Sequence, residues 1–275
     1  MRIVVTGVSG FLGGAVLKNL TDNGFECIGV SRRGGVGHLQ VTDYSCSPVG
    51  DVLIHLAEIN DRAYANQLSS EYENMASRTL HALLSNGYSK VIYASSGVVY
   101  GDDNCKPHKE TDPVNASDIY TCVKMASEHC VLSRGGVVAR FSNIYGPGMA
   151  TGNVLSHILS QIGNSGPVRL KDTNPVRDFL WIEDAADAIV QMVSQSLDGV
   201  FNVGSGIGTS IRELAHETLK AANQSDREVL SDQSVRKASC IILDITKTSA
   251  ALDWYPSVPL NEGLTQLINL QKKVN

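Results

Sequence analysis

Short runs of β-branched and aliphatic residues alternate, along the first half of the chain, with longer segments in which apolar residues recur every three or four positions. The short runs are typical of buried strands, and the longer segments are typical of helices that bury one face. This half therefore predicts a parallel sheet with helices packed on it. The predicted strands cover 2–6, 25–31, 38–43, 51–57, 90–94 and 137–141, and the predicted helices begin after residue 13 and cover 69–84 and 117–132.

The turn after the first predicted strand carries three glycines at three-residue intervals, Gly7, Gly10 and Gly13. A strand that passes through such a turn into a helix directs free N–H groups and the positive end of the helix at one point. Gly7 suits the tight turn, Gly10 the close approach of a ligand, and Gly13 the packing of helix on strand. The turn predicts a site for the pyrophosphate of a dinucleotide. The other loop residues expected at this ligand are Ser9, Phe11 and Leu12.

The end of the second predicted strand indicates which dinucleotide is bound. An acidic residue there would accept a hydrogen bond from the ribose 2′-hydroxyl and repel a 2′-phosphate, but this chain has Ser31 and Arg32. Cationic and hydroxyl groups favour NADP(H), with NAD(H) as the alternative. Three further contacts are expected where neighbouring strands end: Asp43 at the adenine edge, and the main chain of Leu56 and Ala57.

The pattern of predicted elements changes beyond residue 148, where short strands and amphipathic helices alternate less regularly. Predicted strands cover 168–170, 177–182, 200–204 and 241–243, and predicted helices cover 154–162, 183–195, 211–222 and a segment from 260. The predicted fold class is α/β, a Rossmann-type doubly wound parallel sheet with a small C-terminal α/β domain packed on it as a lid. Residues 1–148 and 177–205 are assigned to the NAD(P)-binding domain, and 149–176 and 206–275 to the small domain.

Composition narrows the partners. The 275 residues carry a net charge of −5 without runs of one sign, so neither nucleic acid nor a membrane surface is an expected partner. No apolar run approaches the roughly twenty residues that span a bilayer, and the chain enters a strand at once, so we expect a cytoplasmic protein. The six cysteines form no C-x-x-C pair. We expect all of them to be reduced, and we expect no metal site.

Three residues suit proton transfer coupled to hydride transfer. Tyr120 and Lys124 are four apart in a predicted helix, so they share a face, and Ser96 lies where a predicted strand ends. A tyrosine loses its proton near pH 10 unless a positive charge favours the phenolate, and Lys124 supplies that charge. Ser96 can donate a hydrogen bond to the substrate oxygen while Tyr120 exchanges a proton with it. We predict Ser96, Tyr120 and Lys124 as the catalytic residues, with Tyr120 and Lys124 also touching the cofactor.

With these residues, the chain resembles the extended short-chain dehydrogenases/reductases of the NAD-dependent epimerase/dehydratase family, which modify sugar nucleotides. The resemblance covers nearly the full length. It rests on Thr6-Gly7-x-x-Gly10-Phe11-x-Gly13, His55-Leu56-Ala57, Ala94-Ser95-Ser96-x-x-x-Tyr100-Gly101, Tyr120-x-x-x-Lys124, Arg140-Phe141-Ser142-Asn143-Ile144-Tyr145-Gly146-Pro147-Gly148, Arg177-Asp178-Phe179 and Phe201-Asn202-Val203-Gly204.

The resemblance implies a nucleotide-diphosphate sugar as substrate, held between the two domains, and it makes 149–176 and 206–275 the small C-terminal α/β substrate-binding domain. Asn143 matches the family's diphosphate-contacting asparagine, and Arg177 matches an arginine that pairs with the diphosphate in several members, with Arg236 as a weaker candidate. Arg177 could instead form an interdomain salt bridge. The resemblance also implies a homodimer, formed through the helices at 69–84 and 117–132.

Departures from the family pattern narrow the reaction. The 4,6-dehydratases carry an Asp-Glu pair after the catalytic serine or threonine, and epimerase-reductases carry a cysteine there, whereas Gly97 follows Ser96 here. Both reactions are therefore disfavoured. The remaining chemistry is hydride transfer at one sugar carbon, most simply reduction of a 4-keto sugar nucleotide with NADPH. The alternatives are an NAD-dependent 4-epimerase, similar to UDP-glucose 4-epimerase, and a non-catalytic NAD(P)-binding sensor or scaffold.

Overall fold

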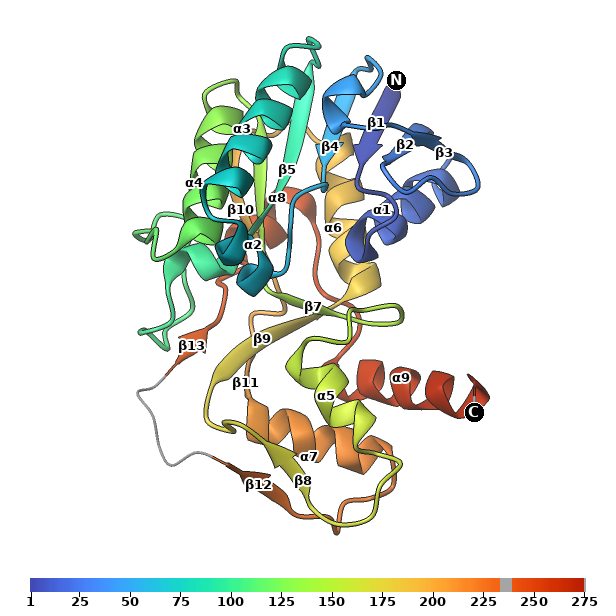
Figure 1. The fold of residues 1–275 in the computed structure, drawn as a ribbon, viewed down its shortest axis with the longest axis vertical. Helices are drawn as coiled ribbons and strands as arrows, with labels where there is room; N and C mark the ends of the chain where they lie inside the picture. The colour runs from blue at the N-terminus through green and yellow to red at the C-terminus, as the bar shows by residue number, and fades with distance from the viewer. Residues whose placement is uncertain (233–238, 275) are drawn as a thin grey trace.

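A computed structural model describes residues 1–232 and 239–274 and contains a seven-stranded parallel sheet with the order β10-β6-β5-β4-β1-β2-β3 (Figure 1). Consecutive residues of β1 alternate between its two faces: Ile3 and Val5 join one buried cluster, and Val4 joins another. Both faces of the sheet are therefore covered by apolar packing. The strands are β1 (Arg2–Thr6), β2 (Glu26–Ser31), β3 (His38–Gln40), β4 (Val52–His55), β5 (Lys90–Ser96), β6 (Val137–Phe141) and β10 (Gly199–Val203).

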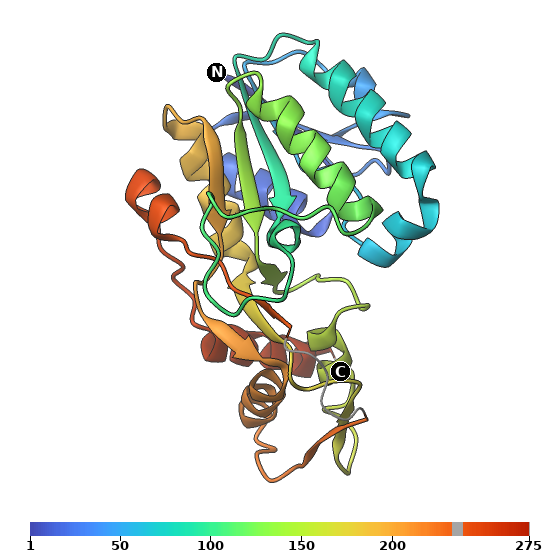
Figure 2. The same cartoon turned by 90° about the vertical axis from the view of Figure 1, so that its left-hand side faces the viewer.

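Helices pack on each face of this sheet. On one face lie α1 (Phe11–Asp22) and α6 (Ile182–Ser194), and on the other lie α3 (Ser70–Leu84) and α4 (Ile119–Leu132) (Figures 1 and 2). Two short helices, α2 (Arg62–Leu68) and α8 (Thr246–Leu252), were not expected from the sequence. The predicted Rossmann-type sheet is confirmed, and it brings the carboxyl ends of β1, β4, β5 and β6 to one edge.

A smaller lobe follows at that edge and has its own core (Figure 1). Its central strand β9 pairs with β7, β11 and β13, while β8 pairs with β12. The strands are β7 (Asn143–Tyr145), β8 (Val168–Leu170), β9 (Val176–Trp181), β11 (Gly208–Ser210), β12 (Val229–Ser231) and β13 (Cys240–Ile241), and the helices are α5 (Val154–Ser160), α7 (Ile211–Ala221) and α9 (Leu260–Val274).

The chain crosses between the two sheets more than once. The segment 177–205, assigned from the sequence to the NAD(P)-binding domain, starts in β9 of the small sheet and continues through α6 and β10 on the large one. The predicted domain limits remain a prediction; β9 itself is hydrogen-bonded only to strands of the small sheet within the part of the chain described here.

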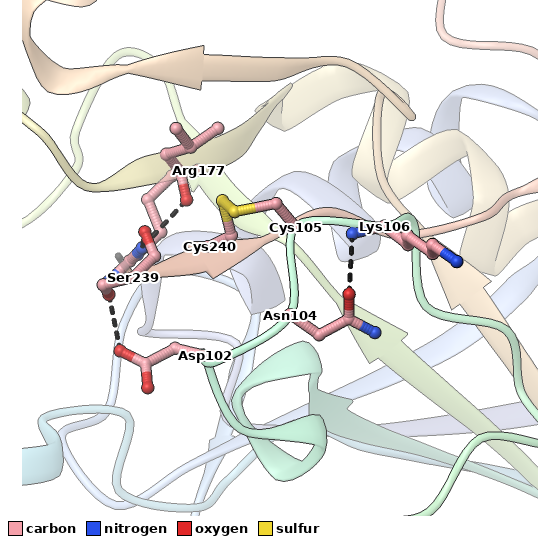
Figure 3. Close-up of a disulfide and its surroundings, with 8 residues drawn as sticks. Asp102, Asn104, Cys105, Lys106, Arg177, Ser239 and Cys240 are labelled. Atoms are coloured by element: carbon pink, nitrogen blue, oxygen red, sulfur yellow. Dashed lines mark hydrogen bonds between the residues drawn. A yellow bond between two sulfur atoms is a disulfide. The ribbon is translucent and has the colours of Figure 1, made fainter. Parts of the chain in front are cut away.

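A disulfide joins Cys105 to Cys240, so the expectation of six reduced cysteines is wrong for this pair (Figure 3). The two residues are 135 positions apart, and only the fold brings them together. The loop after η2 (Gly97–Tyr100) runs beside β13, where the Cys240 N–H donates to the carbonyl of Asp102 at 2.7 Å. A search for close cysteine pairs cannot find such a long-range bond. The four remaining cysteines, Cys27, Cys46, Cys122 and Cys130, are free thiols.

None of the helices formed by residues 1–232 and 239–274 has the length and apolar character needed to cross a lipid bilayer.

Candidate active site

A cleft of about 630 Å³ opens between the carboxyl edge of the large sheet and the small lobe. The glycine turn lines one wall, and Ser96, Tyr120 and Lys124 line another. Met149 and Asn153, from the segment before α5, close the cleft on the side of the small lobe. The fold thus brings the predicted cofactor turn and the predicted catalytic residues into one cavity.

The glycine turn is packed too closely to admit a side chain at Gly7 or Gly13. Gly7 has φ +81°, and a Cβ on it would lie 2.9 Å from the carbonyl carbon of Leu56. A Cβ on Gly13 would lie 2.2 Å from the Gly7 carbonyl oxygen, so a side chain is excluded there. Gly10 is the N-cap of α1, and no side chain caps this helix. The first N–H groups of α1 are therefore open to an anion at the cleft, which fits the pyrophosphate of a dinucleotide.

The catalytic candidates come from β5 and α4. Ser96 ends β5, and its Oγ accepts a hydrogen bond from the Val98 N–H at 3.3 Å. Tyr120 lies in the first turn of α4, and the Lys124 Nζ is 5.8 Å from the centre of its ring. The spacing of four residues therefore places both side chains on the cleft-facing side of the helix, as predicted.

Lys124 is held by two acceptors. Its Nζ donates to the carbonyl of Ala94 at 2.9 Å and forms an ion pair with Glu58, also at 2.9 Å. Burial alone would lower the pKa of Lys124, but the Glu58 carboxylate outweighs that effect and holds the pKa above its usual value. The sequence analysis missed Glu58. The available signal was a carboxylate directly after His55-Leu56-Ala57, at the carboxyl end of β4.

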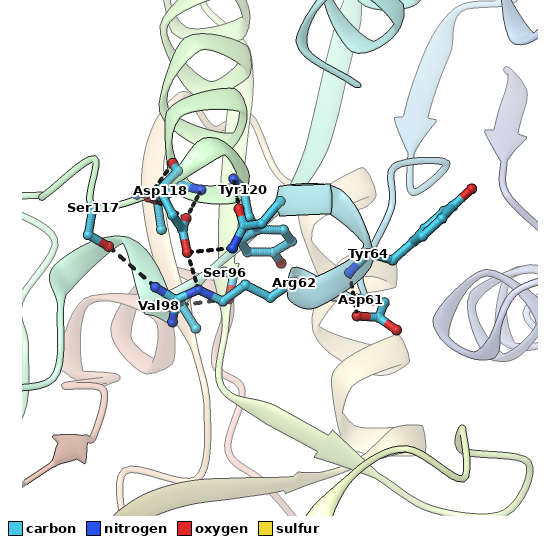
Figure 4. Close-up of polar contacts among 10 residues, drawn as sticks. Asp61, Arg62, Tyr64, Ser96, Val98, Ser117, Asp118 and Tyr120 are labelled. Carbon is cyan, nitrogen blue, oxygen red and sulfur yellow. Dashed lines mark hydrogen bonds and ion pairs between the residues drawn. The ribbon is translucent and has the colours of Figure 1, made fainter. Parts of the chain in front are cut away.

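The start of α4 is fixed by α2, as Figure 4 shows. The carboxylate of Asp118 caps α4 by accepting from the Thr121 N–H, and it also accepts from the side chains of Arg62 and Asn66. Asn66 in turn accepts a hydrogen bond from the Tyr120 N–H at 3.0 Å. These contacts hold the pKa of Asp118 at about 2, against a burial effect in the opposite direction. The short helix thus positions the residue that carries the phenol.

A second, smaller pocket adjoins the cleft at Glu58, which lines both cavities. Three of the predicted cofactor residues line this second pocket. Arg32, Asp43 and Ala57 line it, and the Arg32 guanidinium lies 5.4 Å from the ring centre of Tyr44. Ser31 is fully buried, with its Oγ accepting from the Arg33 N–H at 3.1 Å. The other predicted cofactor residues divide as follows: Gly7, Gly10, Phe11, Leu12, Gly13, Leu56, Tyr120 and Lys124 line the cleft, and Ser9 and Ser31 line neither cavity.

Of the three residues predicted to bind the substrate diphosphate, one lines the cleft. Asn143, the first residue of β7, lines the cleft together with Ser96. Arg177 does not line it, because its guanidinium donates to the Val176 carbonyl and to both the carbonyl and the hydroxyl of Ser239 (Figure 3). Burial lowers the pKa of Arg177. Arg236 lies outside the described residues.

Comparison with known proteins gives consistent matches. Residues 3–204 match the model of the NAD dependent epimerase/dehydratase family. The chain is 26% identical, over 99% of both lengths, to a putative UDP-glucose 4-epimerase of Methanocaldococcus jannaschii. It is 29% identical to a dTDP-4-dehydro-6-deoxyglucose reductase of Escherichia coli, in a match that covers 68% of this chain and 62% of that one.

Solved structures show the same fold over the whole length. A UDP-glucose 4-epimerase from Thermotoga maritima, solved with UDP-glucose, superposes with a TM-score of 0.87 at 23% identity, covering all of both chains. RMD from Pseudomonas aeruginosa, complexed with NADPH, superposes with a TM-score of 0.86 at 24% identity, covering 100% of this chain and 99% of that one.

Proposed function

Because the chain belongs to the NAD dependent epimerase/dehydratase family, we propose that it is an NAD(P)-dependent oxidoreductase that reduces a 4-keto nucleotide-diphosphate sugar. The observation that carries this proposal is the single cleft shared by the glycine turn and by Ser96, Tyr120 and Lys124. An enzyme of this kind must hold a dinucleotide and a carbonyl side by side, and the cleft offers both sites in one cavity.

The residues divide the chemistry among themselves. The dinucleotide, when bound, would supply the hydride. Ser96 donates a hydrogen bond to the carbonyl oxygen, and Tyr120 gives its proton to that oxygen as it becomes a hydroxyl. Lys124 stabilises the phenolate that remains, because its ammonium lies beside the tyrosine ring. Asn143, which lines the same cleft, binds the diphosphate.

The surroundings of Gly97 support hydride transfer without elimination of water. A Cβ at this position would lie 2.9 Å from Leu243 Cδ2 and 3.4 Å from the Phe141 carbonyl oxygen. A carboxylate or thiol side chain would therefore have to displace its neighbours. The chain has no acid or base at the place next to Ser96 where dehydration or 3,5-epimerisation would need one.

We infer a preference for NADPH from the second pocket. The Arg32 side chain is exposed over Tyr44, where it can pair with a 2′-phosphate, and no acidic side chain follows β2 to repel one. Asp43, in the same pocket, suits the adenine edge.

An NAD-dependent 4-epimerase is the second candidate, favoured by the full-length similarity to a putative UDP-glucose 4-epimerase. The same Tyr120 would then take the proton of the sugar hydroxyl and later return a proton to the keto oxygen, while inversion would come from return of the hydride to the opposite face of the same ring carbon. A non-catalytic sensor is disfavoured because Tyr120 and Lys124 are both present and face the cleft. The homodimer and the cytoplasmic location stay predictions, and light scattering of the purified protein tests the first.

One experiment separates the two reactions. The freshly purified protein is denatured, any released nucleotide is identified by mass, and native protein is tested for exchange with added NADPH. Exchange with NADPH, followed by NADPH oxidation with a dTDP- or UDP-linked 4-keto sugar, is the expected result. Tightly held NAD at about one per chain, with interconversion of UDP-glucose and UDP-galactose, would replace the reductase with the epimerase.

A further inference from the structure

Glu58 is a buried carboxylate that the proposed chemistry does not use. It follows β4, and its side chain is 5% exposed. One oxygen accepts from the Tyr93 hydroxyl at 2.6 Å and pairs with the Lys124 Nζ at 2.9 Å, and the other accepts from the Ser127 hydroxyl at 2.9 Å. These partners come from β5 and α4, so Glu58 connects three neighbouring elements beside Lys124.

We propose that Glu58 is a positioning residue of the reaction, which holds the Lys124 ammonium in place near the ring of Tyr120 and keeps it charged over the working pH range. This inference rests on the proposed function for its catalytic consequence. The placement of the ammonium rests on the geometry alone. An ammonium has three N–H donors, of which Ala94 and Glu58 accept two, so the third is left for a group in the cleft.

The other groups around the ammonium cannot replace Glu58. His55, on β4, is fully buried, and burial lowers its pKa to about 4, so it is neutral at pH 7. Glu128, farther along α4, is occupied by a bidentate ion pair with Arg140. The phenols of Tyr72, on α3, and Tyr93, on β5, have pKa values raised by burial, so both are neutral.

Tyr120 is the remaining neighbour of the ammonium, and it is the residue whose phenolate the ammonium would stabilise. Glu58 is therefore the one carboxylate, among the residues that the structure describes, that forms an ion pair with Lys124. Burial alone would raise the pKa of Glu58, but Lys124 and the hydrogen bond from the Tyr93 hydroxyl hold that pKa below its usual value. Both members of the pair are thus charged at neutral pH.

The Glu58→Gln variant keeps the shape of the side chain and removes its charge. Burial then acts on Lys124 without the opposing carboxylate, so its pKa falls from above 10.5. Once the lysine is neutral, the phenolate of Tyr120 has no positive charge beside it. Activity should therefore be lost at a lower pH on the alkaline side, while a purely structural role would lower activity equally at every pH.

The test reads Lys124 directly. Protein labelled with [13Cε]lysine is titrated by NMR, and the Lys124 signal is assigned by its disappearance in Lys124→Arg. In Glu58→Gln we expect the midpoint to fall by about one pH unit or more. The matched control is Ser127→Ala, which removes one hydrogen bond to the same carboxylate but leaves its charge, and whose midpoint should stay near that of the parent.

Glu58→Asp provides a second variant if Glu58→Gln does not fold. Its carboxylate is one methylene shorter, so the Lys124 midpoint should fall between those of the parent and the neutral variant. An unchanged midpoint in whichever variant folds would overturn the proposal.

The pH profile of turnover then tests the catalytic consequence. With the sugar nucleotide established by the cofactor experiment, the alkaline limb of kcat/KM should move down with the Lys124 midpoint in Glu58→Gln and recover in part in Glu58→Asp. A shifted midpoint with an unshifted profile would show that the ion pair exists and does not serve the reaction. Absence of turnover in the parent protein would contradict the proposed function instead, and the NMR titration would still decide whether Glu58 keeps the ammonium charged.

Discussion

The side-chain carbonyl of Asn66 accepts a hydrogen bond from the main-chain N–H of Tyr120 at 3.0 Å, so α2 fixes the turn of α4 that carries the proposed acid. The amide group of Asn66 also donates to Asp118, the N-cap of α4, at 3.0 Å. One side chain thus satisfies a free N–H of the first turn and holds the residue that caps it.

Asn66→Ala should lower both stability and turnover. Loss of the two hydrogen bonds should reduce the free energy of unfolding by about 1–2 kcal/mol, measured by urea denaturation. The start of α4 then becomes free to shift, and kcat should fall by roughly tenfold because proton transfer depends on the position of Tyr120. Gln67→Ala, at an exposed position of the same helix, is the control and should change neither quantity. A normal kcat in Asn66→Ala would show that α2 does not position the tyrosine.

Tyr120→Phe should remove catalysis and keep the cofactor. The variant lacks only the hydroxyl, so kcat should fall by about 10²–10⁴-fold, the usual contribution of a general acid. The dissociation constant for the dinucleotide, followed by fluorescence of the reduced cofactor, should stay within about threefold, because the glycine turn is untouched. Tyr64→Phe removes a hydroxyl from a half-exposed ring on α2 and serves as the control. Turnover at the parental rate in Tyr120→Phe would refute the catalytic assignment.

Two arginines, Arg62 and Arg177, are candidates to bind the substrate diphosphate, and substitution of each should have a different effect. Arg62 lines the cleft, and 47% of its side chain is exposed, so it can reach a phosphate while it pairs with Asp118. Arg62→Ala should raise KM for the sugar nucleotide by about tenfold, because a charge-assisted contact in the ground state and transition state is lost. Since Arg62 also bonds Asp118, kcat should fall as well, but by less than in Asn66→Ala, which loses the direct contact to Tyr120.

Arg177→Ala is the comparison variant. Its guanidinium is committed to Ser239 and the main chain, so the variant should lose about 1–3 kcal/mol of stability through unpaired acceptors. A KM that also rises more than about threefold would support the diphosphate role predicted from the sequence, and an unchanged KM would limit Arg177 to linking β9 with Ser239.

The disulfide should stabilise the junction of the two lobes. Cys105→Ser should lower the free energy of unfolding by about 2–4 kcal/mol under non-reducing conditions, because the bond closes a long loop in the unfolded chain. Dithiothreitol should destabilise the parent by a similar amount and leave the variant unchanged. Cys46→Ser, at an exposed free thiol, is the control. A parent protein with equal stability with and without the reductant would contradict a stabilising bond.

The sequence predicted the parts of the site that local chemistry determines. Gly13 is restricted by atoms of the same turn and Gly7 by the main chain just after β4, and Tyr120 and Lys124 share a face through helical spacing alone. Contacts between distant segments could not be predicted in the same way. The α2 helix has seven residues and buries only Ala65, so it has no amphipathic pattern to reveal it. Glu58 and Cys240 acquire their partners only when the sheet and the small lobe are assembled.

His55 gives the fold a specific dependence on pH. The ring is fully buried in β4, and its Nδ1 is hydrogen-bonded to the Thr6 hydroxyl at 2.8 Å. Burial lowers the pKa of His55 from 6.5 to about 4, so between these values the unfolded chain binds a proton that the folded chain does not. The free energy of unfolding should therefore rise with pH across this window, and it should fall by about 2 kcal/mol on acidification from pH 7 to pH 4.5.

Urea denaturation at half-unit steps from pH 7 to pH 4.5 measures this slope. The measurements stop at pH 4.5, the usual pKa of a glutamate carboxyl. The pKa of Glu58 is below that value in the folded protein, so the stability that Glu58 contributes is lost only at more acid pH and does not disturb the slope. His55→Asn keeps a polar group near Thr6 and removes the titration, so its slope should be much flatter even though its stability at pH 7 is lower. His157→Asn, at an exposed histidine, should retain the parental slope. Equal slopes in the parent and in His55→Asn would mean that His55 does not stay neutral in the fold, and the argument that leaves Glu58 as the charged partner of Lys124 would lose one of its supports.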